Sequence, residues 1–249
     1  YNKQYVDTFA EGFSEYSQHI LKYPPEKMEP ICKITATEIR AVARKIASAN
    51  SAMIFWGMGI SQHVNGTDNA RALISLCLLT GNIGRRGTGL HPLRGQNNVQ
   101  GASDVGLIPQ FYPGYQSADD PTVRKVFEEL WGASLDPHSG LTVVEIMQGA
   151  LNGQITGMYM MGENPFLSDP NINKVRKGLQ KLSFLAVQDI FLTETAEFAD
   201  VILPSSSYLE KLGTYTNTDR RVQIGRPVHG LPGDARLDWQ IITDLSTRM

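Results

Sequence analysis

The sequence has no excess of either charge and no long apolar run, and both absences exclude classes of protein. Its 23 Lys and Arg residues face 25 Asp and Glu residues, so no basic field invites nucleic acid or an anionic membrane. Its longest apolar runs, such as 52–56 and 76–79, are far shorter than the roughly 20 residues that cross a bilayer. No signal-peptide pattern opens the sequence. We therefore expect a soluble, cytoplasmic protein with no nucleic-acid partner and no membrane insertion.

Cysteine is also scarce, and the motifs of several enzyme classes are absent. Cys32 and Cys77 are the only cysteines, and their separation matches neither CxxC nor a metal-ligand spacing. The sequence contains no GxSxG, HExxH or GxxxxGK[ST] motif, and its five histidines are scattered. We predict no metal ligand and no covalent nucleophile in this chain. Any reactive group must therefore come from a cofactor or from another part of the protein.

Short apolar segments that alternate with helical patterns indicate an α/β fold. Strands are predicted at 52–56, 157–161, 184–187 and 200–203. Helices are predicted at 1–29, 35–49, 67–79, 121–131, 142–152, 171–181, 194–198 and 237–249. Thr35 and Glu38 form a capping box at the start of one of them. This alternation predicts two Rossmann-like lobes with mostly parallel sheets and right-handed crossovers.

The order of these patterns suggests how the chain is divided. Residues 1–94 are predicted to be part of a first α/β lobe, and residues 95–208 form a second. Residues 209–249 begin a following segment. The final helical pattern reaches the last residue without a stop signal, so we expect a fragment of a larger multidomain enzyme.

Polar residues follow each predicted strand, where ligands bind in open parallel sheets. Small, amide and carboxylate side chains of this kind hydrogen-bond a purine, a ribose or a phosphate. The residues concerned are Gly57, Met58, Gly59, Ser61 and Gln62; Gly162, Glu163, Asn164, Pro165, Ser168 and Asp169; Gln188 and Asp189; and Pro204, Ser205, Ser206 and Ser207. Guanine would require a carboxylate acceptor, for which Asp189 and Asp238 are available. Ser and Asn are also common helix caps, so no single strand end identifies a ligand.

Residues 81–116 are rich in Gly, Asn, Gln and Pro and are predicted to be loop over much of their length. A loop of this length in a compact domain is usually functional. Within it, the segment RGQNNVQG places Arg94 among four carboxamides, with no acid before Asp104. A guanidinium is the natural bidentate partner of a carboxylate or a phosphate. The alternative is a surface turn with an exposed arginine, although a turn needs no such run of amides.

Seven blocks of the sequence resemble those of a known enzyme family. They are WGMGISQHVNG, LTGNIGRRGTG, PLRGQNNVQGASDVG, YPGYQ, MGENP, VQDIFLTETAEFADVILP and GTYTNTDRRVQ. In this order they resemble the catalytic subunits of formate dehydrogenases, in the dimethyl-sulfoxide-reductase-like superfamily of molybdopterin oxidoreductases. RGQNNVQG and YPGYQ resemble the formate dehydrogenase branch in particular, whereas ADVILP is shared more widely.

The resemblance implies a molybdenum or tungsten ion held by two molybdopterin guanine dinucleotides, one in each α/β lobe. It also implies a 4Fe-4S cluster and a cysteine or selenocysteine metal ligand, both of which lie upstream of Tyr1 in the family. The implied reaction is the oxidation of formate to carbon dioxide, with electrons passed to an electron-transfer subunit or another acceptor. Because this chain lacks the metal ligand, we expect it to be inactive by itself.

The resemblance also implies roles for individual residues. Arg94 matches the arginine that borders the metal and orients formate. Residues that match contacts to the two pterin dinucleotides are Met58, Gln62 and Gln96 for one lobe, and Asn164, Ser168, Gln188, Asp189, Ser205 and Asp238 for the other. Two alternatives stay open at this point. One is a sister oxidoreductase such as a nitrate reductase, and the other is a non-catalytic module that binds the pterin cofactor.

Overall fold

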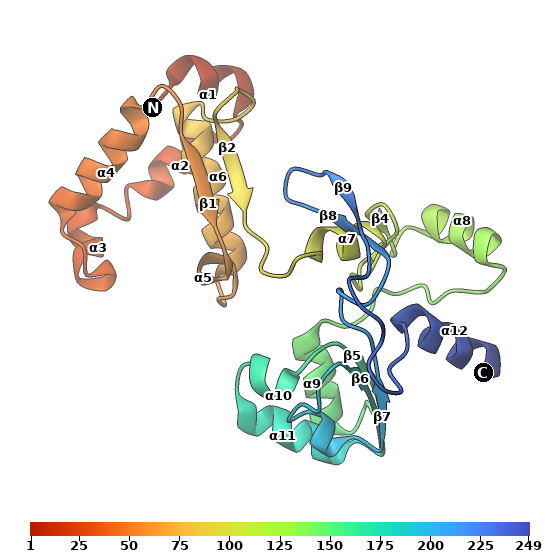
Figure 1. The fold of residues 1–249 in the computed structure, drawn as a ribbon. Coiled ribbons are helices and arrows are strands. Elements are labelled where there is room, and N and C mark those ends of the chain that lie inside the picture. Colours follow the sequence, from red (N-terminus) through yellow and green to blue (C-terminus); the bar gives the residue numbers. More distant parts are fainter. The chain divides into compact units, whose positions relative to one another are not determined.

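A computed structural model describes all residues from Tyr1 to Met249 (Figure 1). The chain separates into two compact units, Tyr1–Gly95 and Gln96–Met249, each of which is described by itself. Each unit contains a parallel sheet with helices, which confirms the predicted α/β class. The residues of the predicted following segment, 209–249, belong to the second unit. No helix in either unit is both long enough and apolar enough to cross a membrane.

The first unit has a two-stranded parallel sheet made of β1 and β2. Their bounds are Met53–Trp56 and Gly89–Pro92. The crossover between them contains α5 (Met58–Ser61) and α6 (Gly66–Thr80). The strand β2 lies in the stretch that was predicted to be largely loop. The stretch is otherwise loop over much of its length, as predicted. The short strand was not expected because Gly89 and Pro92, at its two ends, are poor strand formers, and pairing with β1 outweighs them.

Four helices precede this sheet. They are α1 (Lys3–Phe9), α2 (Phe13–Ile20), α3 (Pro25–Cys32) and α4 (Ala36–Ser48). The single helix predicted over 1–29 was wrong. Gly12, with a φ of 70°, and Pro24 interrupt it. The capping box at the start of α4 is confirmed, since the Thr35 N–H donates to Glu38 Oε2 at 3.0 Å and the Glu38 N–H to Thr35 Oγ1 at 3.2 Å.

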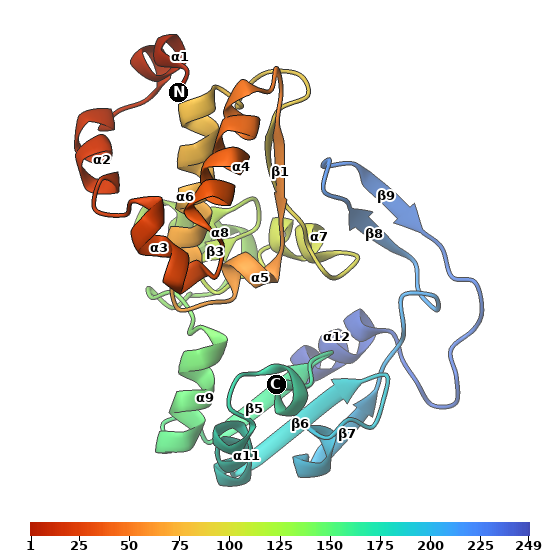
Figure 2. The ribbon, with the colours of Figure 1, turned by 90° about the vertical axis from the view of Figure 1, so that its left-hand side faces the viewer.

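The second unit is built on a three-stranded parallel sheet in the order β5-β6-β7 (Figure 2). These strands span Gly157–Met161, Phe184–Asp189 and Val201–Pro204. The helices that follow or precede them are α9 (Val143–Asn152), α10 (Pro165–Ser168), α11 (Ile172–Lys181) and the short 3-10 helix η1 (Ala196–Phe198). All three strands were predicted: β5 has the predicted bounds, β6 ends two residues later, and β7 is shifted by one residue.

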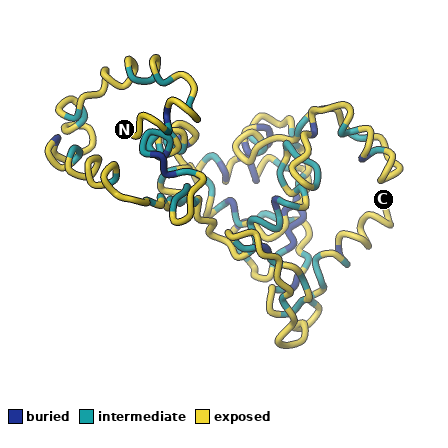
Figure 3. Tube along the Cα trace, turned by 90° about the horizontal axis from the view of Figure 1, so that it is seen from above, coloured by how far each residue is buried: buried dark blue, intermediate teal, exposed yellow.

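The core of the second unit lies between this sheet and its helices. Val187 and Leu185, on the central strand β6, are 0% and 1% exposed. They belong to one cluster with Met147, Met160, Val175, Leu179 and Ala196. Figure 3 shows buried positions along this part of the chain, whereas α2 and α3 of the first unit carry no buried residue. The central strand is therefore the element that anchors the residues at its carboxyl end.

The remaining elements of the second unit lie before and after this sheet in the sequence. They are α7 (Val99–Asp104), β3 (Phe111–Tyr112), β4 (Gln116–Ser117), α8 (Pro121–Trp131), β8 (Gly213–Thr216), β9 (Val222–Gly225) and α12 (Asp238–Arg248). The side chain of Asn98, from the amide-rich loop, donates to the Thr214 carbonyl and accepts from the Thr216 N–H. The loop is thus bonded to a strand more than a hundred residues later.

Candidate functional site

A cavity of about 360 Å³ lies at the carboxyl edge of the β5-β6-β7 sheet. Each of the three strands contributes to it through the residues that follow it. Its polar lining residues are Asp189, Ser205, Ser206, Ser207, Lys211 and Asp238, and Met161, Ile190 and Tyr208 add apolar surface. This is the placement that the strand-end rule predicts, because parallel strands end at the same edge. A cavity of this size and polarity can hold part of a small ligand.

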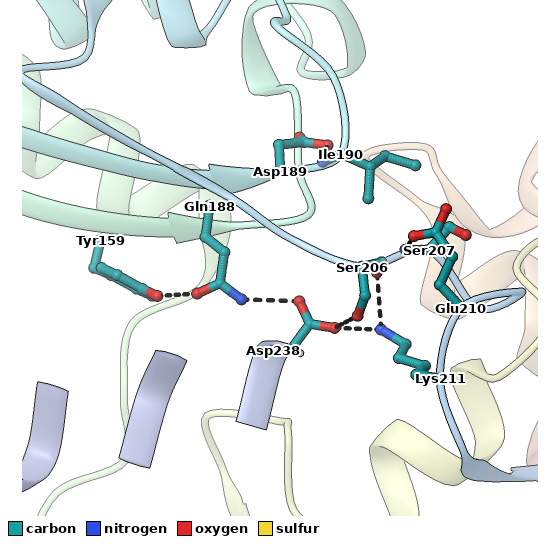
Figure 4. A network of polar contacts seen from close by, with 9 residues as sticks. All are labelled: Tyr159, Gln188, Asp189, Ile190, Ser206, Ser207, Glu210, Lys211 and Asp238. Carbon is teal, nitrogen blue, oxygen red and sulfur yellow. Dashed lines mark hydrogen bonds and ion pairs between the residues drawn. The ribbon is translucent and has the colours of Figure 1, made fainter. Parts of the chain in front are cut away.

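Asp238, the first residue of α12, is the centre of a polar network at this cavity (Figure 4). Its Oδ1 accepts a hydrogen bond from Gln188 Nε2 at 2.8 Å. Its Oδ2 forms an ion pair with Lys211 Nζ and accepts a hydrogen bond from Ser206 Oγ at 3.3 Å. The hydroxyl of Tyr159, on β5, donates to Gln188 Oε1. The network therefore joins two strands of the sheet, the segment after β7 and the start of α12.

The charge of Asp238 determines the direction of these hydrogen bonds. An ionised carboxylate only accepts, so Gln188 must turn its NH2 group towards Asp238 and its carbonyl towards Tyr159. Burial raises the pKa of Asp238, but the ion pair with Lys211 and the hydrogen bond from Gln188 outweigh it and hold that pKa below its ordinary value. Burial, and secondarily the charge of Asp238, raise the pKa of Tyr159, which therefore stays a donor. Asp238 is thus ionised and Tyr159 protonated at neutral pH.

The predicted residues of the second unit fall into two groups. Gln188, Asp189, Ser205 and Asp238 gather at the cavity, although Gln188 is 0% exposed and touches it only through Asp238. Asp189 uses one oxygen, Oδ1, to accept from the Ile190 N–H at 2.6 Å, which leaves Oδ2 available.

Asn164 and Ser168 form the other group and are not among the residues that line the cavity. Asn164 Oδ1 accepts from the Thr195 hydroxyl at 2.7 Å, and its Nδ2 donates to Glu194 at 2.8 Å. Ser168, at the end of α10, donates to Asp169 at 3.4 Å. In this structure the Asn164 amide is therefore engaged in holding the loop after β5 to the segment before η1.

The predicted residues of the first unit lie at the carboxyl edge of the β1-β2 sheet. Met58 begins α5 and is 58% exposed, and Gln62 is the C-cap of the same helix. Arg94 follows β2 by two residues, and the Leu93 N–H donates to the Trp56 carbonyl at 2.7 Å. No carboxylate within residues 1–95 lies within ion-pair distance of the Arg94 guanidinium. Gln96, the first residue of the second unit, is exposed.

The sequence did not reveal Tyr159, Ser206 or Lys211 as members of one network. Tyr159 stands in an apolar strand sequence where an aromatic residue is ordinary. Lys211 and Asp238 are 27 residues apart, a separation with no helical or strand periodicity. The position of Lys211, a charged residue shortly after the end of β7, is a sequence signal for a role at this edge. Its pairing with Asp238 can be seen only in the folded chain.

Acceptor groups at this cavity remain available to a ligand that carries N–H groups. Asp238 has about four lone-pair positions, of which Gln188, Ser206 and Lys211 fill three, so one remains. The free oxygen of Asp189 lies on the same cavity. Asp238 and Asp189 thus each keep an acceptor position at this cavity.

Comparison with known proteins identifies the family of this chain. The sequence model of a family described as molybdopterin oxidoreductase matches residues 7–248. This chain belongs to the molybdopterin oxidoreductase family. Membership implies a molybdopterin cofactor, for which the polar edges of the two sheets are the candidate positions.

The relatives of this molybdopterin oxidoreductase chain include formate dehydrogenases. It is 46% identical over 248 residues to a formate dehydrogenase alpha subunit of Methanocaldococcus jannaschii, and covers 36% of that protein. It is 45% identical over 250 residues to formate dehydrogenase H of Escherichia coli, and covers 35% of it. The chain is fully covered in both alignments and spans about a third of the length of these relatives.

A solved structure supports the fold. Acetylene hydratase from Pelobacter acetylenicus matches all of this chain with a TM-score of 0.74 at 20% identity, over 37% of its own length. At this identity the match concerns the fold only.

Proposed function

We propose that this chain is the cofactor-binding portion of a molybdenum- or tungsten-dependent formate dehydrogenase, with Arg94 as the residue that orients formate. The observation that carries the proposal is the exposed Arg94 guanidinium at the β2 strand end, with no carboxylate partner in its own unit. The high identity to formate dehydrogenases along the whole chain supports it. The full-length protein would be cytoplasmic and would pass electrons to another subunit or acceptor.

In this proposal each unit binds one molybdopterin guanine dinucleotide. Residues 1–94 and 95–208 supply the two lobes, and Asp238 comes from the segment after them. The proposed contacts are Met58, Gln62 and Gln96 for one dinucleotide, and Asn164, Ser168, Gln188, Asp189, Ser205 and Asp238 for the other. The two carboxylates at the cavity would accept N–H groups of the guanine base, and Gln188 would act by holding Asp238 in place.

The reaction would remove two electrons and a proton from formate and leave carbon dioxide. The metal–pterin cofactor, once bound, supplies the redox chemistry, and a 4Fe-4S cluster outside this chain would carry the electrons onward. Arg94 would donate two parallel N–H groups to the two formate oxygens, which directs the C–H bond away from the guanidinium. Holding a small anion in one orientation lowers the barrier because the cost in entropy is met on binding.

The test is to supply the purified full-length protein with formate and a redox dye, and in parallel with reduced dye and nitrate. We expect carbon dioxide to form from formate and no nitrate to be reduced. Nitrate reduction without formate oxidation would show a nitrate reductase-like enzyme instead. Binding of the pterin cofactor without either activity would show a non-catalytic module. The 249-residue chain alone is expected to be inactive in both assays.

A further inference from the structure

We propose that Lys211 and Tyr159 are positioning residues for guanine recognition, Lys211 by keeping Asp238 ionised and Tyr159 by fixing the Gln188 amide that holds it (Figure 4). The inference rests on the proposed function, because it assumes that a guanine nucleotide enters the cavity beside Asp238. Neither residue belongs to the set of predicted cofactor contacts. Their role would be to prepare the carboxylate that makes the contact.

Lys211 is the cation that neutralises Asp238. Its Nζ pairs with Asp238 Oδ2 and also donates to the Ser206 carbonyl at 3.2 Å. The side chains of Lys211 and Asp238 are only 30% and 25% exposed. Solvent therefore screens this pair less than it screens a surface pair. Without this cation, only hydrogen bonds from neutral donors would oppose the effect of burial, and the pKa of Asp238 would rise.

The other charged or titratable groups around Asp238 do not replace Lys211. Tyr159 on β5 is protonated and uncharged, and Asp189 at the end of β6 carries a carboxyl group, so neither is a cation. Glu210, next to Lys211, accepts from the Ser207 N–H at 2.8 Å and lies 3.9 Å from the His229 ring. Arg236, which precedes α12, is paired with Asp244 on that helix. Lys211 is thus the cation that bonds directly to Asp238.

Tyr159 holds the end of the Gln188 amide that faces away from Asp238. Both ends of this amide are engaged, Oε1 by the Tyr159 hydroxyl and Nε2 by Asp238. The reverse orientation would place the amide carbonyl against the Asp238 carboxylate. Without the hydroxyl, a fully buried carbonyl would lose its hydrogen-bond partner, and the Gln188 amide would be held at its Asp238 end alone.

An ionised Asp238 affects which nucleotide base the cavity binds. Guanine presents a ring N–H and an exocyclic amine side by side, and either of these donors can use the one acceptor position that remains on Asp238. Adenine presents an unprotonated ring nitrogen at the equivalent position, and its lone pair would face the same anion. An ionised, fixed Asp238 therefore favours guanine over adenine, and this preference depends on Lys211 and Tyr159.

The test measures binding of GDP and ADP, by calorimetry, to the full-length protein produced in cells that cannot make the pterin cofactor. The variants are Lys211→Met, Lys211→Arg and Tyr159→Phe, and the control is Lys125→Met, an exposed lysine on α8. We expect Lys211→Met to weaken GDP binding about tenfold and to leave ADP binding unchanged, since one charge-supported hydrogen bond is lost. Tyr159→Phe should lower GDP affinity several-fold, and Lys211→Arg should retain most of it.

The pH dependence gives a second, independent measurement. The pKa of Asp238 is lowered in the native protein, so its carboxylate stays ionised well into the acid range and GDP affinity should be flat between pH 7 and pH 5. In Lys211→Met only burial and the neutral donors remain, so the pKa rises. GDP affinity should then fall as the pH is lowered over this range, and Lys211→Arg should restore the flat profile.

The outcomes separate a failure of the guanine site from a failure of the positioning roles of Lys211 and Tyr159. If the native protein does not prefer GDP to ADP, both the guanine site and the positioning roles are wrong. If it does and the Lys211→Met and Tyr159→Phe proteins keep that preference, only the positioning roles are wrong. Equal losses of GDP and ADP in Lys211→Met would mean that Lys211 binds phosphate, which also contradicts the inference. Should Lys211→Met fail to fold, Lys211→Gln, which also removes the charge, and Tyr159→Phe provide the same decision.

Discussion

Replacing Arg94 with Lys in the full-length protein is expected to lower kcat/KM for formate about 100-fold, the loss of roughly 3 kcal/mol of transition-state stabilisation. Lysine keeps the positive charge but replaces a planar fork with a single ammonium, so it cannot hold both formate oxygens in parallel. The exposed position of Arg94 makes a folding defect an unsuitable explanation for such a loss. Steady-state kinetics with varied formate, alongside the metal and nucleotide content of each protein, would measure it.

The matched control is Arg44→Lys, at an exposed arginine of α4 that makes no hydrogen bond or ion pair through its side chain within its own unit. Its kinetics should match those of the native protein. If Arg94→Lys has full cofactor content and an unchanged kcat/KM for formate, Arg94 does not orient formate. A loss of cofactor in Arg94→Lys would instead assign this residue to cofactor binding.

Replacing Leu185 with Ala is expected to lower the free energy of unfolding of the second unit by about 2–5 kcal/mol. Leu185 is 1% exposed on the central strand β6 and belongs to the cluster that joins the sheet to its helices. Truncation removes apolar burial and leaves a cavity that close-packed neighbours fill only in part. Urea unfolding should show a lower midpoint with an unchanged dependence on denaturant concentration.

Leu192→Ala is the matched control, since Leu192 is the same residue type at 75% exposure. We expect it to change the free energy of unfolding by no more than about 0.5 kcal/mol. Similar losses in Leu185→Ala and Leu192→Ala would contradict the placement of the core beneath β6. Because β6 ends at the residues that line the cavity, Leu185→Ala should also weaken ligand binding at that edge.

The sequence predicted most of the α/β order because apolar runs and helical periodicity are local signals. The strand β5 has the predicted bounds, and the capping box that starts α4 is present as expected. The strand β2 was not predicted because its formation depends on pairing with β1 rather than on the propensity of its own residues. The first 29 residues form three helices because breaks at Gly12 and Pro24 outweigh a continuous apolar pattern.

The candidate site was predictable where it depends on topology and not where it depends on side-chain pairing. Parallel strands end at one edge, so Asp189 and Ser205 could be expected together, and they line one cavity. The approach of Lys211 to Asp238 depends on how the segment after β7 returns to α12, for which the sequence carries no local signal. The same holds for Tyr159, whose hydroxyl matters only because the neighbouring strand β6 carries the buried amide of Gln188.

We propose that this chain binds molybdopterin guanine dinucleotide as part of a formate dehydrogenase. The most direct test is to denature the purified full-length protein, hydrolyse the released cofactor and quantify its nucleotides and metal. We predict about two guanine nucleotides per molybdenum or tungsten ion, because each lobe would hold one dinucleotide and the two would share one ion. Release of a pterin without guanine, or of another nucleotide in its place, would contradict the account.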